Sequence, residues 1–216
     1  MVDLFTSTGY SSNDFQTIHL QDGELRLYPN FYSEENANLL LADLQREIQW
    51  KQEKMRMYGK THDLPRLMAF YGDQKQGDKS EGEKKRQYSF SGIRKAPTKW
   101  TASLIEIKKK IELVSQKEFN SVLANLYRDG SDGVAWHSDD EVELGKAPVI
   151  GSVSFGQVRE FQLKHKTRSE LRHSLFLPHG SFLLMSGLIQ KYWLHQVPKR
   201  TSAMSARINL TFRTIY

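Results

Sequence analysis

Apolar positions recur at helical spacing in two stretches of the first half of the chain. The first stretch opens with Ser33, Glu34 and Glu35, the capping and acidic residues that typically begin a helix. Its apolar residues then repeat along one face, at Ala37, Leu40, Leu41, Leu44 and Ile48. The second stretch follows Pro97-Thr98 and repeats in the same way, at Trp100, Leu104, Ile107, Ile111 and Val114. The pattern predicts two amphipathic helices that pack on a sheet.

From Asn120 onward the pattern changes to short strand-like runs separated by turn signals such as Asp129-Gly130 and His179-Gly180. The runs are SVLANLY, VAWHSD, PVIGSVSFG, REFQLKH, HSLFLP, SFLLMS, YWLHQVP and ARINLTFRTIY. Many short strands without helices between them are typical of a barrel or a double-sheet jelly roll. We therefore expect a mainly β fold with flanking helices.

Composition narrows the possible classes of protein. The 216 residues (25.1 kDa) fit a single domain, and 38% hydrophobic content supports a real core. A mean hydropathy of -0.59 and the lack of a long apolar run argue against a membrane span, and no signal peptide is visible. There are no cysteines, which excludes disulfides, thiolate metal sites and a cysteine nucleophile. Any metal must be held by histidine and carboxylate.

The excess positive charge lies in one stretch, residues 51–100, which holds thirteen Lys and Arg against six Asp and Glu. We expect loops and short hairpins there. Aromatic residues are interleaved with the basic ones: Tyr58, Phe70, Tyr71, Tyr88, Phe90 and Trp100. This mixture suits a polyanion with flat bases, which indicates nucleic acid. The alternative is a solvated loop that happens to be rich in lysine.

Two histidines and one aspartate are candidate metal ligands. His137 and Asp139 are two positions apart, so on a strand they share a face, and His195 lies in another strand-like run. Two imidazoles and one carboxylate form the facial triad of non-haem Fe(II) oxygenases. His179 is a rival third ligand, but its position before Gly180 is more typical of a hydrogen-bonded turn residue.

The last strand-like run alternates between polar and apolar residues. Its odd positions are Arg207, Asn209, Thr211 and Arg213, and its even positions are apolar. If the polar face lines the interior, the arginines can bind a dianion, with help from Asn125 and Tyr127 on an earlier strand. A di-acid beside a facial-triad iron suggests 2-oxoglutarate. Alternatively, the polar face is exposed to solvent.

Several motifs also occur in a fixed order within residues 56–216. They are NLYRDG from Asn125, HSDDE from His137, SVSFG from Ser152, REF from Arg159, HGS from His179, HQVP from His195 and RINLTFR from Arg207. This ordered set resembles the AlkB family of Fe(II)/2-oxoglutarate-dependent nucleic-acid dealkylases. The resemblance implies a double-stranded β-helix core in a single dioxygenase domain. It further implies an N-terminal helical extension (1–55), a substrate-recognition lid (56–100) and a helix plus jelly-roll catalytic core (101–216).

The resemblance also implies roles for individual residues. The iron ligands would be His137, Asp139 and His195. The 2-oxoglutarate pocket would be formed by Asn125, Tyr127, Arg207, Thr211 and Arg213. Arg213 would face the carboxylate that chelates the metal, and Arg207 with Tyr127 the distal one. Lid and base-pocket contacts are implied for Pro65, Arg66, Leu67, Tyr88, Ser89, Phe90, Trp136 and Asp140, of which Asp140 resembles the acidic residue that contacts the flipped base.

Within the family, residues 56–60 are most like the branch that acts on double-stranded DNA. Met57 or Tyr58 would fill the gap left by the extruded base, which offsets part of the lost stacking. The hydroxyl of Tyr58 and the apolar Leu67 in a basic lid depart from that pattern, and Tyr58 is alternatively an exposed hairpin tip. Residues 164–166 (KHK) would clamp the complementary strand or, alternatively, protect an edge strand.

The function implied is oxidative demethylation of N1-methyladenine and N3-methylcytosine in DNA. Fe(II), O2 and 2-oxoglutarate would be consumed or bound, and formaldehyde, succinate and CO2 released. The alternatives are the same chemistry on RNA or protein, a non-catalytic nucleic-acid-binding jelly roll, and a zinc hydrolase, although a hydrolase would not need Arg207 and Arg213. We expect alkylated DNA as the partner, no membrane association, a monomer, and a cytoplasmic location (nuclear in a eukaryote).

Overall fold

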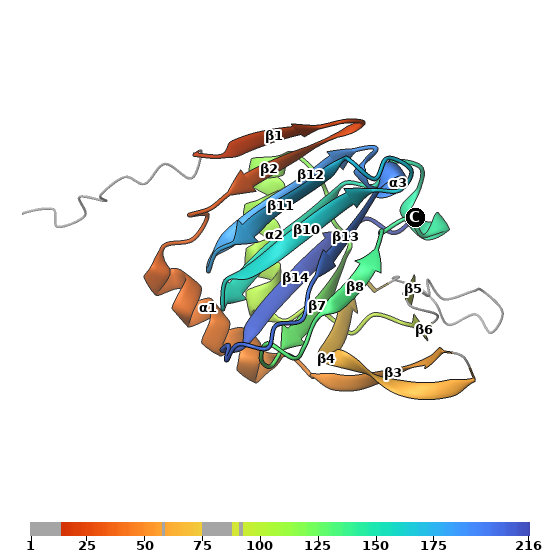
Figure 1. The fold of residues 1–216 in the computed structure, drawn as a ribbon. Coiled ribbons are helices and arrows are strands. Elements are labelled where there is room, and N and C mark those ends of the chain that lie inside the picture. Colours follow the sequence, from red (N-terminus) through yellow and green to blue (C-terminus); the bar gives the residue numbers. More distant parts are fainter. Residues whose placement is uncertain (1–13, 58, 75–87, 91–92) are drawn as a thin grey trace, which may run out of the picture.

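The computed structural model describes residues 14–57, 59–74, 88–90 and 93–216. It has three layers: a small sheet, a large sheet, and two helices behind the large sheet (Figure 1). The mainly β class with flanking helices and a jelly-roll core is therefore confirmed. No helix in the described ranges is long and apolar enough to cross a membrane.

The large sheet has eight strands in the order β1-β2-β12-β9-β14-β7-β4-β3, and each neighbouring pair is antiparallel. The bounds are β1 Gln16–Leu20, β2 Gly23–Tyr28, β3 Lys51–Met57, β4 Lys60–Gly72, β7 Ser121–Tyr127, β9 Ile150–Gly156, β12 Ser181–Gly187 and β14 Arg207–Arg213. The central strand β14 pairs with β7 on one side and β9 on the other. It is buried along its whole length.

The small sheet has four strands in the order β11-β10-β13-β8. Its bounds are β8 Val134–His137, β10 Arg159–His165, β11 Arg172–Leu177 and β13 Trp193–Val197. A separate hairpin pairs β5 (Tyr88–Phe90) with β6 (Ile93–Lys95), and two short turns complete the elements, a 3-10 turn at Val142–Leu144 and α3 at Ile189–Tyr192. All eight strand-like runs after Asn120 thus form strands, as predicted.

Both predicted helices form. Helix α1 covers Glu34–Glu47, and the Ser33 side chain accepts a hydrogen bond from the Asn36 N–H, as the N-cap prediction required. Helix α2 covers Ala102–Ser115 and is capped in the same way by Thr101. Trp100 therefore precedes the helix instead of belonging to it, and its ring stacks on Phe212 of β14.

The two faces of β14 have opposite chemistry and opposite surroundings. Its even residues, Ile208, Leu210 and Phe212, belong to the core between the large sheet and the helices. Its odd residues face the space between the two sheets, where a second apolar core includes Phe161, Leu163 and Leu183. The polar face is therefore interior, and the solvent-exposed alternative is wrong because the small sheet covers it.

The N-terminal part contains more than the predicted helix. Strands β1 and β2 form a hairpin that extends the large sheet through β12, with Leu25 and Leu27 in the core between the sheets. The region between α1 and α2 also differs from short hairpins, because β4 spans 13 residues and pairs with β7. The boundary predicted at residue 56 falls inside β3.

Truncation of a core side chain tests this layering. Leu210→Ala should lower the free energy of unfolding by about 2–5 kcal/mol, because Leu210 is fully buried between the sheet and the helices. The matched control, Leu39→Ala, removes the same atoms from a side chain that is 60% exposed on α1 and should change stability by less than about 0.5 kcal/mol. Urea unfolding measures both variants, and equal losses would contradict the placement of the core.

Candidate active site

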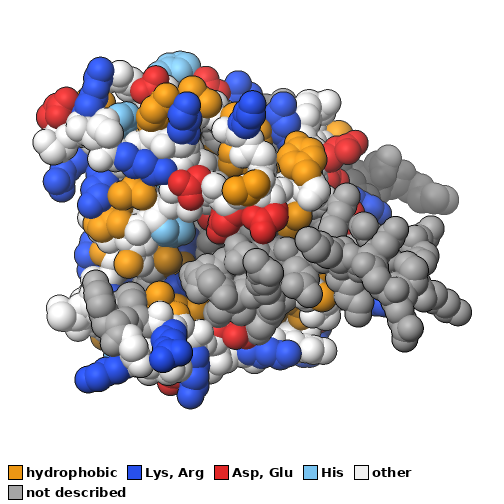
Figure 2. Space-filling model, turned by 90° about the vertical axis from the view of Figure 1, so that its right-hand side faces the viewer, with side chains coloured by type: hydrophobic (Ala, Val, Ile, Leu, Met, Phe, Trp, Pro, Cys, Tyr) orange, Lys and Arg blue, Asp and Glu red, His pale blue; other side chains and the backbone are white. Residues whose placement is uncertain are grey.

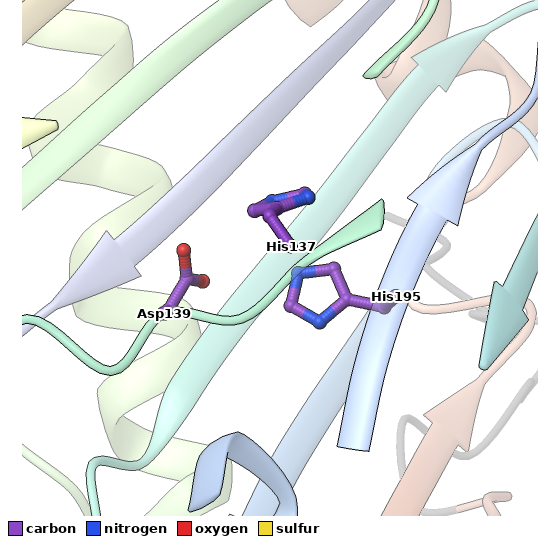
Figure 3. Close-up of side chains that lie close together, drawn as sticks. All are labelled: His137, Asp139 and His195. Carbon is purple, nitrogen blue, oxygen red and sulfur yellow. The ribbon is translucent and has the colours of Figure 1, made fainter. Parts of the chain in front are cut away.

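The three predicted metal ligands lie together. His137 is the last residue of β8, Asp139 follows two residues later, and His195 is on β13. One ligand atom from each lies within 4.8 Å of the other two, and the three side chains converge from neighbouring segments (Figure 3). The two histidines are direct partners in the β8–β13 ladder, with ring centroids 4.3 Å apart. Strand pairing therefore places two ligands, and the loop after β8 brings the third.

These side chains are in the protonation state that a metal ion requires. Burial lowers the pKa of His137, and burial together with His137 lowers the pKa of His195 to about 3, so both imidazoles are neutral at pH 7. Burial raises the pKa of Asp139, but Arg213 and the histidines outweigh this effect and lower it to about 2. Nδ1 of His137 lies 2.8 Å from the Ala135 carbonyl oxygen, which makes Nδ1 the protonated nitrogen and leaves the Nε2 lone pair available.

The donor set fits iron. A carboxylate and two neutral imidazoles are the ligands of the facial triad, and Asp139 and His195 are shielded from solvent. The Nδ1 atom of His195 is buried without a hydrogen-bond partner among the described residues. The carboxylate of Asp139 also accepts a buried hydrogen bond of 2.8 Å from Arg213 Nη2, so it lies between the guanidinium and the histidines.

Next to the triad, the odd residues of β14 line a polar pocket. Arg207 Nη2 donates to Ser154 Oγ at 2.9 Å, Asn209 donates to Ser152 and the Val153 carbonyl, and Thr211 donates to Asn209. The pocket is lined by all the residues predicted for 2-oxoglutarate, namely Asn125, Tyr127, Arg207, Thr211 and Arg213, and also by the three metal ligands. The structure thus brings the two predicted groups into one cavity.

The guanidinium of Arg207 is the strongest indication of what this pocket binds. Arg207 is 1% exposed and lies over the Tyr127 ring, 5.2 Å from its centroid. Burial lowers its pKa to about 10, so it still carries its charge at pH 7. Its Nε and Nη1 atoms reach no hydrogen-bond partner in the described part of the chain. A buried cation with two unused donors fits the carboxylate of a small di-acid such as 2-oxoglutarate.

A second hollow, of about 370 Å³, adjoins the polar pocket at His137 and Asp139. The two also share Arg66, Leu123, Val134 and Arg213. The rest of the hollow's wall is largely apolar and includes Met55, Leu64, Pro65, Ala135 and Trp136. A hollow of this size and lining can take a flat heterocyclic ligand. The triad therefore lies where a di-acid pocket and a larger hollow meet.

The predicted lid residues 65–67 separate along β4. The Arg66 guanidinium is buried and donates from Nε to Asn125 Oδ1 at 2.9 Å, so it belongs to the wall between the pocket and the hollow. Pro65 lines the hollow, and its carbonyl accepts a hydrogen bond from the Gly133 N–H. Leu67 alternates with Arg66 and so lies on the opposite face of the strand.

Trp136 and Asp140 lie at the rim of the hollow and on the loop beside it. Trp136 lines the hollow, and Lys164 Nζ lies 4.5 Å from the centroid of its ring. Asp140 is exposed and its Oδ2 accepts a hydrogen bond of 2.9 Å from Lys166. Between these two lysines His165 is buried. At the edge of the site, Lys164 therefore contacts Trp136 and Lys166 contacts Asp140.

Some predicted substrate contacts cannot be placed. Tyr58 lies outside the described residues. The backbone of Met57 ends β3 and that of Tyr88, Ser89 and Phe90 forms β5, but their side chains also lie outside the described part of the structure. His179, the rival ligand, accepts a hydrogen bond from the Gly156 N–H at 2.8 Å and is not part of the metal cluster, as its turn context indicated.

Two residues near the site were not assigned roles from the sequence. Arg159, buried on β10, donates to the carbonyls of Asp129, Asp132 and Pro198 and so ties together the loops behind the polar pocket. Gln190, in α3, accepts a hydrogen bond from the Asp139 N–H. Arg159 stands in one of the motifs of the resemblance, whereas Gln190 has no signal beyond being a polar residue in an apolar run.

Comparison with known proteins agrees with this geometry. The profile of the 2OG-Fe(II) oxygenase superfamily matches residues 24–213. The chain is 38% identical over 199 residues to "Alpha-ketoglutarate-dependent dioxygenase alkB homolog 3" from Mus musculus, covering 88% of this chain and 65% of that protein. It thus spans about two thirds of that relative's length.

A second relative is matched over more of its length. "DNA oxidative demethylase ALKBH2" from Mus musculus is 33% identical over 222 residues, covering 96% of this chain and 89% of that protein. The solved structure of OsALKBH1 superposes with a TM-score of 0.61 at 15% identity, covering 92% of this chain and 100% of that one, which supports the fold alone. The site and the sequence matches together show that this chain belongs to the AlkB family within the 2OG-Fe(II) oxygenase superfamily, for which Fe(II), 2-oxoglutarate and O2 are the implied cofactor and cosubstrates.

Proposed function

We propose that this protein is a DNA-repair dioxygenase that removes methyl groups from N1-methyladenine and N3-methylcytosine. The observation that carries the proposal is that three parts meet at one point: a His-Asp-His triad, a polar pocket with a buried arginine whose Nε and Nη1 have no partner among the described residues, and an adjoining hollow. Membership of the AlkB family and likeness to proteins named as DNA oxidative demethylases support it. Formaldehyde, succinate and CO2 are the products of this reaction.

The residues divide the work between binding and orientation. Iron with 2-oxoglutarate and O2 supplies the oxidising chemistry when bound. His137, Asp139 and His195 hold the metal, and Arg207 over Tyr127 binds the distal carboxylate of 2-oxoglutarate. Arg213 holds Asp139 and faces the other end of the cosubstrate. Because Asp139, His195, Arg207 and Arg213 are buried, these groups are shielded from solvent on the side of the polar pocket.

The hollow and its rim suit a cationic base. An N1-methyladenine or N3-methylcytosine base carries positive charge. Glu141 lines the hollow, and two further acidic side chains, Glu143 and Asp140 (which pairs with Lys166), follow the same loop. Acidic side chains gather beside apolar ones on the face that Figure 2 presents. Such a rim attracts a cationic base more than a neutral one. Trp136 in the wall of the hollow offers a stacking surface.

The base must leave its duplex to reach the hollow, which costs a few kcal/mol. The hairpin of β3 and β4 (Figure 1) contributes Met55, Leu64 and Pro65 to the hollow, and its strands last pair at Met57 and Lys60. Lys54, Arg56 and Lys60 supply positive charge along it for the phosphate backbone. In this proposal Met57 and Tyr58, which follow one another in this part of the sequence, have the role of filling the gap in the duplex.

Mass spectrometry of a repaired oligonucleotide tests the proposed reaction. Protein reconstituted anaerobically with Fe(II) and then given 2-oxoglutarate and air should remove one methylene mass from DNA containing a single N1-methyladenine. The loss should require 2-oxoglutarate, and parallel single-stranded DNA, duplex DNA and RNA substrates report the strand preference. Succinate release without a mass change in any of the three would contradict nucleic-acid repair and leave an oxygenase with another substrate.

Asp139→Ala separates metal binding from DNA binding. The variant should lose all detectable demethylation, because it removes the only carboxylate of the triad, while its affinity for methylated DNA stays within about threefold of wild type. Turnover under metal-controlled conditions and fluorescence anisotropy of labelled DNA measure the two properties. Retained turnover would show that Asp139 is not a ligand.

Arg207→Met tests the di-acid pocket. Loss of charge-assisted hydrogen bonds worth about 1.5–3 kcal/mol should raise the KM for 2-oxoglutarate roughly 10- to 100-fold. The control, Arg200→Met, removes an arginine that pairs with Glu160 outside the pocket and should leave this KM unchanged. Steady-state succinate formation measures both, and an unchanged KM in Arg207→Met would assign the buried arginine to another anion.

A further inference from the structure

Asp139 lies beyond the strand that leads to it. The ladder between β8 and β13 ends at the pair His137–His195, and β8 itself ends at His137. Beyond this pair β13 continues through Leu194 and Trp193, which pair with β10 and not with the Asp139 loop, and the single turn α3 (Ile189–Tyr192) comes directly before them. The two histidines are therefore fixed by strand pairing, whereas the backbone of Asp139 needs another support.

Gln190 of α3 supplies that support. Its Oε1 accepts a hydrogen bond of 3.0 Å from the Asp139 N–H, and both residues are buried. Its Nε2 lies 3.7 Å from Met185 Sδ on β12, a contact that orients the amide with its oxygen toward Asp139. Gln190 is 1% exposed, so water cannot easily replace it at the Asp139 N–H. The hydrogen bond between Gln190 and the Asp139 N–H is therefore buried and held by defined partners at both ends of the amide.

Lys166 adds a second tie between α3 and the same loop. Its Nζ donates to the Gln190 carbonyl oxygen at 3.0 Å and to Asp140 Oδ2 at 2.9 Å. Two consecutive residues of the ligand loop, Asp139 and Asp140, are thereby attached to one residue of α3. The segment that continues into β13 carries His195 five residues later, so it both contributes one ligand and supports another.

We propose that Gln190 is a positioning residue for the metal site, acting through the backbone of Asp139. The carboxylate of Asp139 can interact with two partners. One is a metal ion held by His137 and His195, and the other is the Arg213 guanidinium at 2.8 Å. The Gln190 bond holds the Asp139 main chain so that the carboxylate faces the histidines while it contacts Arg213. Without this acceptor the loop is free to follow the ion pair, and the metal loses its carboxylate ligand. The proposal rests on the triad of the proposed function.

Metal titration of the full-length protein tests this role without any nucleic-acid substrate. Mn(II) is added to metal-free protein, and free Mn(II) is counted by electron paramagnetic resonance. Gln190→Met, which keeps the volume and removes the acceptor, should weaken Mn(II) binding about 10-fold or more, the size expected for loss of a partner that orients a ligand. Gln190→Glu keeps an oxygen toward Asp139 and should bind Mn(II) no more than about threefold more weakly.

Gln196, on the strand β13 that follows α3, provides a matched control. Gln196→Met removes the same group from β13, but Gln196 donates to Gln162 at 2.6 Å on the outside of the small sheet. Its Mn(II) affinity should equal that of wild type. Thermal unfolding of each metal-free variant reports the fold, and the Mn(II)-induced rise in Tm should shrink only in Gln190→Met. Lys166→Met removes the more exposed contacts with Asp140 and the Gln190 carbonyl, and it should weaken Mn(II) binding by about threefold. This variant replaces Gln190→Met in the test if Gln190→Met does not fold.

The outcomes separate clearly. Mn(II) binding by Gln190→Met equal to that of Gln196→Met would overturn the proposal, as would equal losses in the Met and Glu variants at position 190. If Gln190→Met does not fold, wild-type affinity in Lys166→Met overturns it. Wild-type protein that binds no Mn(II) would overturn the triad itself and this proposal with it. Failure to repair DNA with normal Mn(II) binding would count against the proposed substrate alone.

Discussion

A single strand with two buried faces of opposite chemistry, β14, determines where the rest of the structure lies. Its apolar residues need a core, which the helices α1 and α2 complete behind the large sheet. Its polar residues cannot be buried without partners, so the space they face must hold hydrogen-bonding groups or a charged ligand. The second sheet closes that space, and β13, β8 and the loop after β8 bring the three candidate metal ligands to it. The active-site cavity follows from this one alternation.

The charges inside the cavity favour a small anion next to a metal cation. Arg66, Arg207 and Arg213 are all buried around it, and Asp139 is the buried carboxylate that faces Arg213. A buried cation is tolerated when it is paired, and Nε and Nη1 of Arg207 have no hydrogen-bond partner within the described residues. The cavity is therefore complete only with a dianion and a metal cation, each of which offsets part of the other's charge. Binding of the two is expected to be coupled through the short distance between Arg213 and Asp139.

Periodicity predicted most of the fold, because burial on one face of a strand or helix leaves a direct trace in the sequence. The alternation of β14 and the helix face from Ala37 to Ile48 are clear examples. The grouping of His137, Asp139 and His195 was also predictable, since few residue types bind iron and the histidines stand in strand-like runs. Features that were not predicted include the β1–β2 hairpin, the length of β4, and the contacts of Arg159 and Gln190. The pairing of strands and the hydrogen bonds from side chains to the backbone depend on contacts between residues distant in sequence, such as Gln190 and Asp139. Hydrophobic periodicity does not predict such contacts.

The most direct test of this account is the binding of 2-oxoglutarate, measured anaerobically by calorimetry, to metal-free and Mn(II)-loaded protein. The account places the metal and the di-acid in one cavity, so each should tighten the binding of the other by the same factor. We expect Mn(II) to strengthen 2-oxoglutarate binding at least about 10-fold, a coupling of about 1.4 kcal/mol. Equal affinity with and without Mn(II) would contradict the account, because the triad and the buried arginines would then be separate sites.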